Sequence, residues 1–395
     1  MKTLSCYVRL ALPALTIAGL LFGPNPATAA QPTFQTKARQ AIMIDFDTGT
    51  VLFEKDSNSP MFPASMSKIM TALLVFDELR AGRLQMDSTF RVSEKAWRMG
   101  GSKMFVSINT EIKIADLLRG VIVQSGNDAS IVIAEGISGT EESFAERMTE
   151  RAREIGLTGT QFRNATGWPD PEHYTTARDL ATLAIFLIRE YPEFYTLYSE
   201  REFTYGKSLQ GKPISQGNRN PLLYTSVGAD GLKTGYTEAS GFGLTASAVR
   251  GERRLVMVIN GLNSVRARSS ESERLINWGF RVFDNYPLFQ AGDTVEEAKV
   301  WLGDSGTVPL VIDEPLTVTI PKSSRRGMQV KVMYDSPIPA PVVAGAEVAR
   351  IEITAPDMQP VLRPLITAQD IDRLAFFGRI KSAIDFIIFG SSSDS

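Results

Sequence analysis

Hydrophobic and polar positions follow two different periods along this chain, and each period predicts one kind of element. Short apolar and β-branched runs predict strands at 41–46, 51–54, 230–237, 241–249 and 255–259. Turn residues between the first two runs, and between the last two, predict antiparallel hairpins. Apolar positions at helical spacing predict helices over 65–82, 114–123, 129–135, 141–157, 176–189 and 270–283.

The pattern changes after Tyr286. Short β-type runs at 299–302, 308–312, 316–320, 330–332 and 348–353 are separated by Gly, Pro and Asp, which predicts a small all-β domain, a sandwich. Residues 367–390 are helical again. The large apolar side chains of this stretch share one broad side, so we expect an amphipathic helix in a membrane interface. A helix docked on the β domain or in an oligomer contact is the alternative.

The N-terminus carries a targeting pattern. Lys2 and Arg9 precede a short apolar run, 10–22, and Ala27-Thr28-Ala29-Ala30 follows it. A basic region, a short apolar core and an Ala-x-Ala site predict a secretory signal that is cut near Ala29 or Ala30. A retained N-terminal anchor is the alternative. Cys6 lies before the apolar core and would be lost with the signal.

Composition narrows the chemistry. The chain has 395 residues and a formal net charge of −2, which gives no support for nucleic-acid binding. Cys6 is its single cysteine and His173 its single histidine. The mature protein is therefore expected to lack disulfides, thiolate chemistry and a His-rich zinc cluster, and no metal or other cofactor is expected. A secreted hydrolase of this composition would need lysine, rather than a Ser-His-Asp triad, to activate a nucleophile.

A serine followed three residues later by a lysine opens the most apolar of the predicted helices. Positions i and i+3 are neighbours on a helix, so the amine of Lys68 is expected beside the hydroxyl of Ser65. The helix start also offers unpaired backbone N–H groups. A hydroxyl, an amine and free N–H donors are what a serine acyl-transferase requires. The structural alternative is that Ser65 only caps the helix.

Two further motifs follow in order. Ser125-Gly126-Asn127 lies in a tight connection between two predicted buried helices, and Lys233-Thr234-Gly235 lies on or beside a predicted strand. Together with Ser65-x-x-Lys68, this set resembles the penicillin-binding-protein and serine β-lactamase superfamily. It is most similar to the low-molecular-weight penicillin-binding proteins that are serine-type D-alanyl-D-alanine carboxypeptidases. Secondary matches lie at 162–165, 173–179, 218–220 and 277–280.

The resemblance covers nearly the whole chain, in the layout of the membrane-anchored type-5 members. It implies an α+β catalytic domain in which an antiparallel sheet is flanked by helices, followed by the small β-sandwich and the terminal amphipathic helix. The expected divisions are a signal peptide at 1–29, the catalytic domain at 30–285, the all-β domain at 286–365, and the helix and tail at 366–395. The expected location is the periplasmic face of the inner membrane.

The resemblance also implies a mechanism. Ser65 attacks the carbonyl of the penultimate D-alanine in a peptidoglycan stem peptide that ends in D-Ala-D-Ala, and β-lactam antibiotics acylate it in the same way. Lys68 acts as the base, provided that burial and the neighbouring cation Lys233 keep it neutral. Ser125 relays a proton to the leaving amine. The oxyanion is expected between the backbone N–H groups of Ser65 and Tyr236.

The remaining site residues are expected to bind the substrate. Cations must meet its terminal carboxylate, and a guanidinium can do so in a bidentate way. The residues implied are Asn127, Lys233, Thr234, Gly235, Tyr236, Arg219 and Arg268. Arg268 lies in a charged loop by sequence, so a solvated role is its alternative. His173 is expected to hold its loop rather than to act in catalysis.

Other functions remain open at this stage. A class A β-lactamase would need an added glutamate between Asn127 and Lys233, and no convincing Glu-x-x-Leu-Asn occurs in that interval. An endopeptidase that cuts D-Ala cross-links has the same motifs. A non-catalytic wall-binding protein would not need all three. The oligomeric state cannot be deduced from the sequence.

Overall fold

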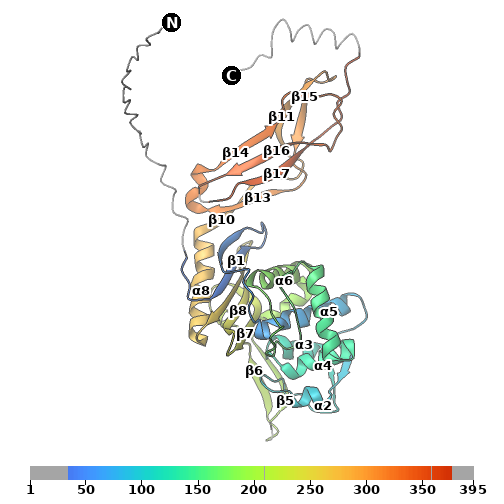
Figure 1. Cartoon of the computed structure of the whole chain (residues 1–395), viewed down its shortest axis with the longest axis vertical. Coiled ribbons are helices and arrows are strands. Elements are labelled where there is room, and N and C mark those ends of the chain that lie inside the picture. The colour runs from blue at the N-terminus through green and yellow to red at the C-terminus, as the bar shows by residue number, and fades with distance from the viewer. Residues whose placement is uncertain (1–33, 209, 357, 376–395) are drawn as a thin grey trace, which may run out of the picture.

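The computed structural model describes residues 34–208, 210–356 and 358–375 (Figure 1). The predicted signal peptide, 1–29, and the part of the predicted terminal helix beyond residue 375 lie outside these residues. The described chain forms two bodies along one long axis, a larger mixed domain and a smaller β domain. Helix α8 (Val265–Val282) leads directly into the first strand of the β domain, β10 (Phe283–Phe289).

A five-stranded antiparallel sheet forms the centre of the larger domain. Its strands follow in the order β2 (Val51–Lys55), β1 (Gln40–Asp45), β9 (Arg253–Leu262), β8 (Gly241–Arg250) and β7 (Ala229–Thr237). Both predicted hairpins are confirmed as β1–β2 and β8–β9. Strand β7 lies at the edge of the sheet, so one side of its backbone pairs with no other strand of the sheet.

Helices cover both faces of this sheet, as expected for the fold class. Val256 and Val258 of β9 point into a core with α6 (Ala177–Glu190), while Met257 points to the opposite face and packs with α8. This alternation follows from the two-residue period of a strand. The remaining α-helices are α1 (Lys68–Arg80), α2 (Glu94–Arg98), α3 (Ile114–Ile122), α4 (Asn127–Ser138), α5 (Glu141–Glu154) and α7 (Pro192–Tyr195).

Helix α1 lies inside the domain. Every residue from Lys68 to Phe76 is buried, which explains why its sequence is apolar on all sides. A single 3-10 turn, η1 (Ala64–Ser67), precedes it. The smaller pieces of this domain are the pairs β3 (Thr89–Arg91) with β4 (Glu111–Lys113) and β5 (Glu202–Lys207) with β6 (Pro213–Gly217), and the 3-10 turns η2 (Thr196–Ser199) and η3 (Pro221–Tyr224).

The β domain has a six-stranded and a two-stranded sheet around a shared apolar core. The six strands follow in the order β14 (Gln329–Tyr334), β16 (Glu347–Thr354), β17 (Val361–Thr367), β12 (Thr307–Val311), β11 (Thr294–Trp301) and β15 (Ile338–Pro339). Strand β10 pairs with β13 (Leu316–Pro321), which the turn η4 (Lys322–Gly327) follows. The predicted all-β domain is therefore confirmed.

The prediction that a terminal helix begins near residue 367 is wrong. Thr367 is the last residue of β17, and the chain then forms isolated bridges at Ile371 with Val342 and at Arg373 with Gly303. The side chain of Ile371 is buried in the core of the β domain. The helical spacing of apolar residues suggested a helix here. The segment is extended instead, because it pairs with residues distant in sequence. The rest of the predicted helix, beyond residue 375, lies outside the described residues.

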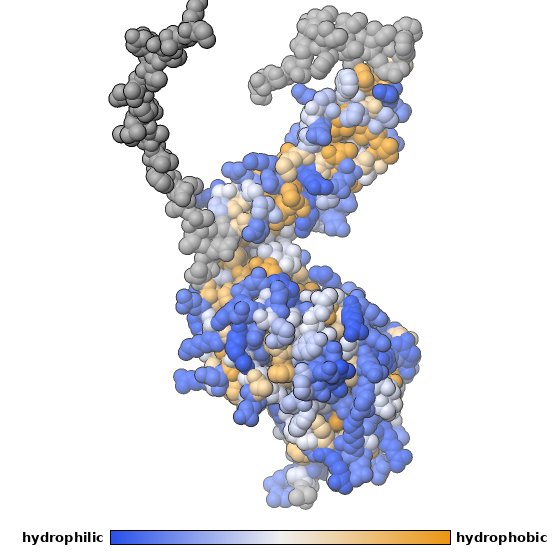
Figure 2. Space-filling view, in the orientation of Figure 1, coloured by the Kyte–Doolittle hydropathy of each residue, from blue (hydrophilic) through white to orange (hydrophobic). Residues whose placement is uncertain are grey.

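Polar residues cover much of the visible surface of the larger domain, whereas hydrophobic residues gather on the visible face of the β domain (Figure 2). Exposed apolar side chains of this domain include Val330, Met333 and Leu362. Among the described residues, no helix has the length and hydrophobicity needed to cross a bilayer.

A buried carboxylate connects the two domains. Asp45, at the end of β1, is fully buried and accepts from Nε of Arg253 at 2.8 Å. Its other carboxylate oxygen accepts from Nδ2 of Asn285, in β10, at 3.1 Å. The carboxylate therefore links the central sheet to the first strand of the β domain.

We predict that Asp45→Ala lowers the free energy of unfolding by about 3 kcal/mol or more, since it leaves the guanidinium of Arg253 buried without its counter-ion. Urea unfolding of the full chain measures the loss. Arg98→Ala is the control, because it breaks the exposed Arg98–Glu94 pair and is expected to cost less than ~1 kcal/mol. Equal losses for the two variants would contradict the structural role of Asp45.

Candidate active site

The predicted contact between Ser65 and Lys68 is confirmed. Ser65 lies in η1 and Lys68 is the first residue of α1, and Nζ of Lys68 donates to Oγ of Ser65 at 3.1 Å. No side chain caps either helix start, and Pro63 and Ser67 hold the two N-cap positions. The alternative that Ser65 serves only as a helix cap is therefore wrong.

Lys68 is 1% exposed and lies among neutral acceptors. Besides Ser65, its amine donates to Oδ1 of Asn127 at 2.7 Å and to the carbonyl oxygen of Thr166 at 2.5 Å. Burial, reinforced by the charge of Arg219, lowers the pKa of Lys68 to about 7, against the opposing fields of Asp128 and Glu141. A large fraction of this amine is therefore neutral near pH 7, as a general base must be.

Two cations act on Lys68. Arg219, which was not expected to have this effect, lowers its pKa. The repulsion between Lys68 and Lys233 is mutual, so the effect expected of Lys233 is present as well. Burial, followed by the charges of Lys68, Arg219 and Arg268, lowers the pKa of Lys233 well below its ordinary value.

Ser125 and Asn127 approach the lysines from the other side of the cleft. Oγ of Ser125 accepts from Nζ of Lys233 at 2.9 Å, and the backbone of Ser125 has a φ of +60°. Asn127 was expected in the loop but is the first residue of α4. The helix starts early because the N–H of Asn127 finds a partner outside the helix, the carbonyl oxygen of Ser102, at 2.7 Å.

Strand β7 forms one wall of the site. Lys233, Thr234 and Gly235 are buried on it, whereas Tyr236 is 54% exposed and stacks on the ring of Phe242 in β8. A Cβ at Gly235 would lie 2.7 Å from the carbonyl oxygen of Pro63. Only glycine permits this close approach of β7 to the turn that carries Ser65.

Arg268 was expected in a charged loop, and this expectation is wrong. Ser264 caps α8 by accepting from the N–H of Ala267, so the helix begins at Val265 and Arg268 lies in its first turns. The first turns of α8 contain few apolar residues, so hydrophobic periodicity did not predict them as helical. Arg268 is 7% exposed and donates to the carbonyl oxygen of Arg219 at 3.4 Å.

Basic side chains gather in this cleft without a carboxylate in direct contact. Among the described residues, no carboxylate forms an ion pair with Lys68, Lys233, Arg219 or Arg268. Burial, together with Arg219, lowers the pKa of Arg268 to about 10, and its buried Nε has no hydrogen-bond partner within the described chain. Arg219 remains exposed and donates to Oγ of Ser102 at 2.5 Å. An anion placed between these groups would relieve both the repulsion and the unmade hydrogen bond.

Three residues that the sequence analysis missed organise the site. The carboxylate of Asp128 accepts backbone N–H groups of residues 104–106 and holds the loop that ends one side of the cleft. Glu141 accepts from the N–H of Ala165, next to the Thr166 carbonyl that binds Lys68. Ser102 fixes Arg219. The position of Asp128, directly after Ser-Gly-Asn, was the only sequence signal for these roles.

His173 supports the nucleophile from behind, in the structural role expected for it. Its Nδ1 accepts from the N–H of Arg163, so Nε2 carries the proton and donates to Oγ of Ser67 at 2.8 Å. Ser67 in turn donates to the carbonyl oxygen of Ala64. Burial lowers the pKa of His173 to about 4, so the ring stays neutral at ordinary pH.

The fold and this geometry are those of a serine acyl-transfer enzyme, with a buried lysine in contact with the serine hydroxyl. The described residues contain no group of three or more His, Cys, Asp or Glu side chains that could hold a metal ion. Residues 25–264 match the D-alanyl-D-alanine carboxypeptidase family, and residues 283–373 match the C-terminal domain of penicillin-binding protein 5. The chain belongs to the D-alanyl-D-alanine carboxypeptidase family.

Similar proteins share both domains. The D-alanyl-D-alanine carboxypeptidase DacC of Escherichia coli is 37% identical, over 91% of this chain and 91% of that protein. DacA of Haemophilus influenzae is 33% identical, over 95% of this chain and 94% of its own length. The crystal structure of penicillin-binding protein 5 from H. influenzae covers 86% of this chain and 99% of that chain, with a TM-score of 0.77 and 33% identity.

We predict that the Lys68 amine titrates near pH 7, and that Arg219→Gln moves this midpoint to higher pH. Removing the guanidinium removes a charge that disfavours the protonated amine. A pH titration of 13C-labelled lysine by NMR measures the midpoint, and the signal lost in Lys68→Ala assigns it. Arg201→Gln, an exposed control, is expected to leave it unchanged. A downward shift in Arg219→Gln would refute the assigned cause.

Proposed function

We propose that this protein removes the terminal D-alanine from peptidoglycan stem pentapeptides through an acyl-enzyme on Ser65. The observation that carries the proposal is the 3.1 Å contact between Oγ of Ser65 and the buried amine of Lys68, beside a cleft of unpaired cations. Family membership and the full-length relatives named as D-alanyl-D-alanine carboxypeptidases support the substrate class.

Acylation begins when neutral Lys68 takes the proton of the Ser65 hydroxyl. Oγ then attacks the carbonyl carbon of the penultimate D-alanine, and the carbonyl oxygen becomes an oxyanion held by the backbone N–H groups of Ser65 and Tyr236. The C–N bond breaks once its nitrogen receives a proton. Ser125 relays to it the proton that Lys68 took from Ser65, which leaves Lys68 neutral again. The amine of Lys233 donates to the hydroxyl of Ser125 at 2.9 Å and holds it in place. Free D-alanine leaves.

The carboxylate of the substrate binds where the cations gather. Lys233 and Thr234 lie on β7, and Arg268 and Arg219 approach from α8 and from the segment before η3. Arg268 has a buried donor to offer, so its guanidinium binds the carboxylate directly. The side chain of Asn127 accepts from Lys68 through Oδ1, and one of the two N–H groups on Nδ2 donates to the carbonyl oxygen of Gly100. The second N–H group is left to bind the substrate amide.

Hydrolysis of the acyl-enzyme uses the same base in a second cycle. Lys68 takes a proton from water as the water oxygen attacks the ester carbonyl. It then gives that proton to Oγ of Ser65 as the C–Oγ bond breaks, which restores the free hydroxyl. β-Lactams acylate Ser65 because their carboxylate and strained amide resemble the substrate. Asp128 and Glu141, the two carboxylates whose fields reach Lys68, are engaged with backbone N–H groups. Neither is free to activate water, which favours a carboxypeptidase that hydrolyses β-lactams slowly over a β-lactamase.

The proposal also assigns a cellular location to the protein and a role to each part of the chain. Residues 1–29 direct export and are removed, 30–285 carry the chemistry, and the tail beyond the β domain holds the protein at the periplasmic face of the inner membrane. Support comes from the sequence patterns at both ends of the chain. The β domain lies between the catalytic domain and the tail in the order of the chain, and it extends away from the catalytic domain along the long axis of the described residues (Figure 1).

We predict that Lys68→Ala folds but acylates about 10²- to 10⁴-fold more slowly, because the general base is lost. Ser65→Ala is expected to abolish both labelling by a fluorescent penicillin and release of D-alanine from a D-Ala-D-Ala pentapeptide. Mass spectrometry of the peptide measures the second activity. Lys113→Ala, at an exposed position of β4, is the control and keeps both activities. Unimpaired acylation in Lys68→Ala would remove this lysine from the mechanism.

We predict that truncation after Ala375 releases the protein from membranes and leaves its activity on a soluble peptide unchanged. The cut must not lie earlier, because β17 and the buried Ile371 belong to the β domain. Sedimentation with vesicles of bacterial lipid, with the chain from residue 30 to 395 as reference, measures the change. A truncated protein that still sediments with the vesicles would show that the tail is not the anchor.

A further inference from the structure

The peptide bond that joins Ala64 to Ser65 sets the direction of the N–H of Ser65, the proposed oxyanion donor. This bond is trans. The carbonyl and the N–H of a trans peptide lie in one plane and point in opposite directions. Among the described residues, no backbone carbonyl outside η1 accepts the N–H of Ser65, so no bond to the backbone holds it from its own side. Whatever holds the carbonyl of Ala64 therefore also aims this N–H.

Two contacts hold that carbonyl. Oγ of Ser67 donates to its oxygen at 2.9 Å, and Gly167 packs so closely that a Cβ there would lie 1.8 Å from the same atom. Ala64 has a φ of +49°, in the left-handed region that residues with a side chain rarely adopt. Local preference alone would not keep this peptide in place, so its orientation depends on the two contacts.

His173 orients the hydroxyl of Ser67. Its Nδ1 accepts from the N–H of Arg163 at 3.2 Å, so Nε2 carries the proton and donates to Oγ of Ser67 at 2.8 Å. A hydroxyl that accepts from the ring directs its own hydrogen to another acceptor, which here is the carbonyl of Ala64. The ring packs edge-to-face on Phe162, with 5.5 Å between the centroids. His173 and Ser67 are 2% and 0% exposed, so water does not compete for these bonds.

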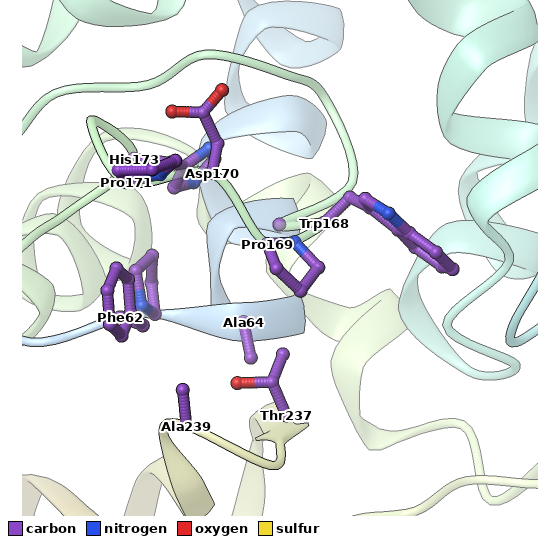
Figure 3. A pocket seen from close by; sticks show the side chains of 11 residues that line it. Phe62, Ala64, Trp168, Pro169, Asp170, Pro171, His173, Thr237 and Ala239 are labelled. Atoms are coloured by element: carbon purple, nitrogen blue, oxygen red, sulfur yellow. The ribbon is translucent and has the colours of Figure 1, made fainter.

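The ring has no second partner to serve at this position. His173 and Ala64 both line an apolar pocket of about 260 Å³ that opens beside the nucleophile (Figure 3). Both ring nitrogens are engaged within the protein, so neither is left for a molecule in the pocket. The hydrogen-bonded chain from the ring therefore ends at the peptide before Ser65.

We infer that Ser67 and His173 are positioning residues for the oxyanion. They hold the Ala64–Ser65 peptide so that the N–H of Ser65 points at the oxygen on which negative charge develops. The hydrogen bond to the carbonyl also polarises the peptide and strengthens that N–H as a donor. The inference rests on the proposed acyl-enzyme and adds two residues to it. Because the charge appears only in the transition state, loss of either residue slows acylation and leaves binding of the substrate unchanged.

Ser67→Ala tests the inference by removing the bond to the carbonyl. We expect acylation of Ser65 by a fluorescent penicillin to slow by about 10- to 100-fold, since a misaimed oxyanion donor is partly lost. A boronic acid analogue of the penultimate D-alanine forms a tetrahedral adduct with Oγ of Ser65, and one of its oxygens occupies the oxyanion position. The dissociation constant of this analogue is expected to rise by a similar factor.

Binding of the unreacted substrate separates this role from a merely structural one. In Ser65→Ala, which cannot form an acyl-enzyme, addition of Ser67→Ala is expected to change the Kd of a D-Ala-D-Ala peptide by less than about twofold. NMR titration measures this Kd. Ser67→Thr keeps the hydroxyl and restores most of the acylation rate, whereas the thiol of Ser67→Cys is a weak donor and does not restore it.

His173→Leu tests the second residue. It is expected to slow acylation in the same range as Ser67→Ala. A variant that carries both changes is expected to be no slower than the slower single variant, because the two residues act through one carbonyl and their effects are not additive.

Ser199→Ala is the matched control. Oγ of Ser199 donates to a carbonyl oxygen three residues earlier in η2, as Ser67 does in η1, so acylation and Kd stay as in the unmodified protein. Unchanged acylation in both Ser67→Ala and His173→Leu, or a Kd that weakens as much as acylation slows, would overturn the positioning role and leave the proposed function intact. Should Ser67→Ala not fold, Ser67→Cys and His173→Leu give the same decision. Failure of the unmodified protein to release D-alanine from the peptide, despite penicillin labelling of Ser65, would instead refute the carboxypeptidase function.

Discussion

Burial of an amine without a carboxylate partner is the constraint on which this site depends. Lys68 sits in an apolar interior with only neutral oxygen acceptors, and taking an ammonium ion out of water costs several kcal/mol. The charged form is therefore the disfavoured one, and the amine can accept a proton from a neighbouring alcohol. A carboxylate in contact with Lys68 would restore the ammonium and abolish the base, which is why Asp128 and Glu141 act on it only at a distance.

Such an arrangement requires the surrounding fold to be rigid. Ala64 and Ser125 both have positive φ values, at +49° and +60°, in segments that carry or face the nucleophile. Residues without glycine's freedom adopt this conformation only where packing over-determines it. The wholly buried α1, the close approach at Gly235 and the hydrogen bonds from His173 through Ser67 provide that packing. The packing that stabilises the core of this domain therefore also maintains the geometry of the site.

Much of this could be predicted from the sequence, because the site is built from short motifs on regular elements. The spacing of Ser65 and Lys68 determines their contact once a helix is assumed, and the strands around Lys233 have strong β patterns. Predictions failed where long-range partners decide the backbone. The extended segment after Thr367 binds Val342 and Gly303, and the early start of α4 depends on the carbonyl of Ser102. The effect of Arg219 on the pKa of Lys68 was also not identifiable, since it depends on position in space.

The surroundings of β7 change from cationic to apolar along the strand. Along a few consecutive residues this strand carries Lys233 and Thr234 among the cations, Gly235 against the turn that carries the nucleophile, and Thr237 at an apolar pocket. Charge is concentrated at one end and apolar surface at the other, so a peptide with a C-terminal carboxylate can lie along the strand in only one direction. In the reversed direction the carboxylate would enter the apolar pocket without a partner, at a cost of several kcal/mol. Under the proposed function, this direction explains why the last peptide bond of a chain is the one that Ser65 attacks.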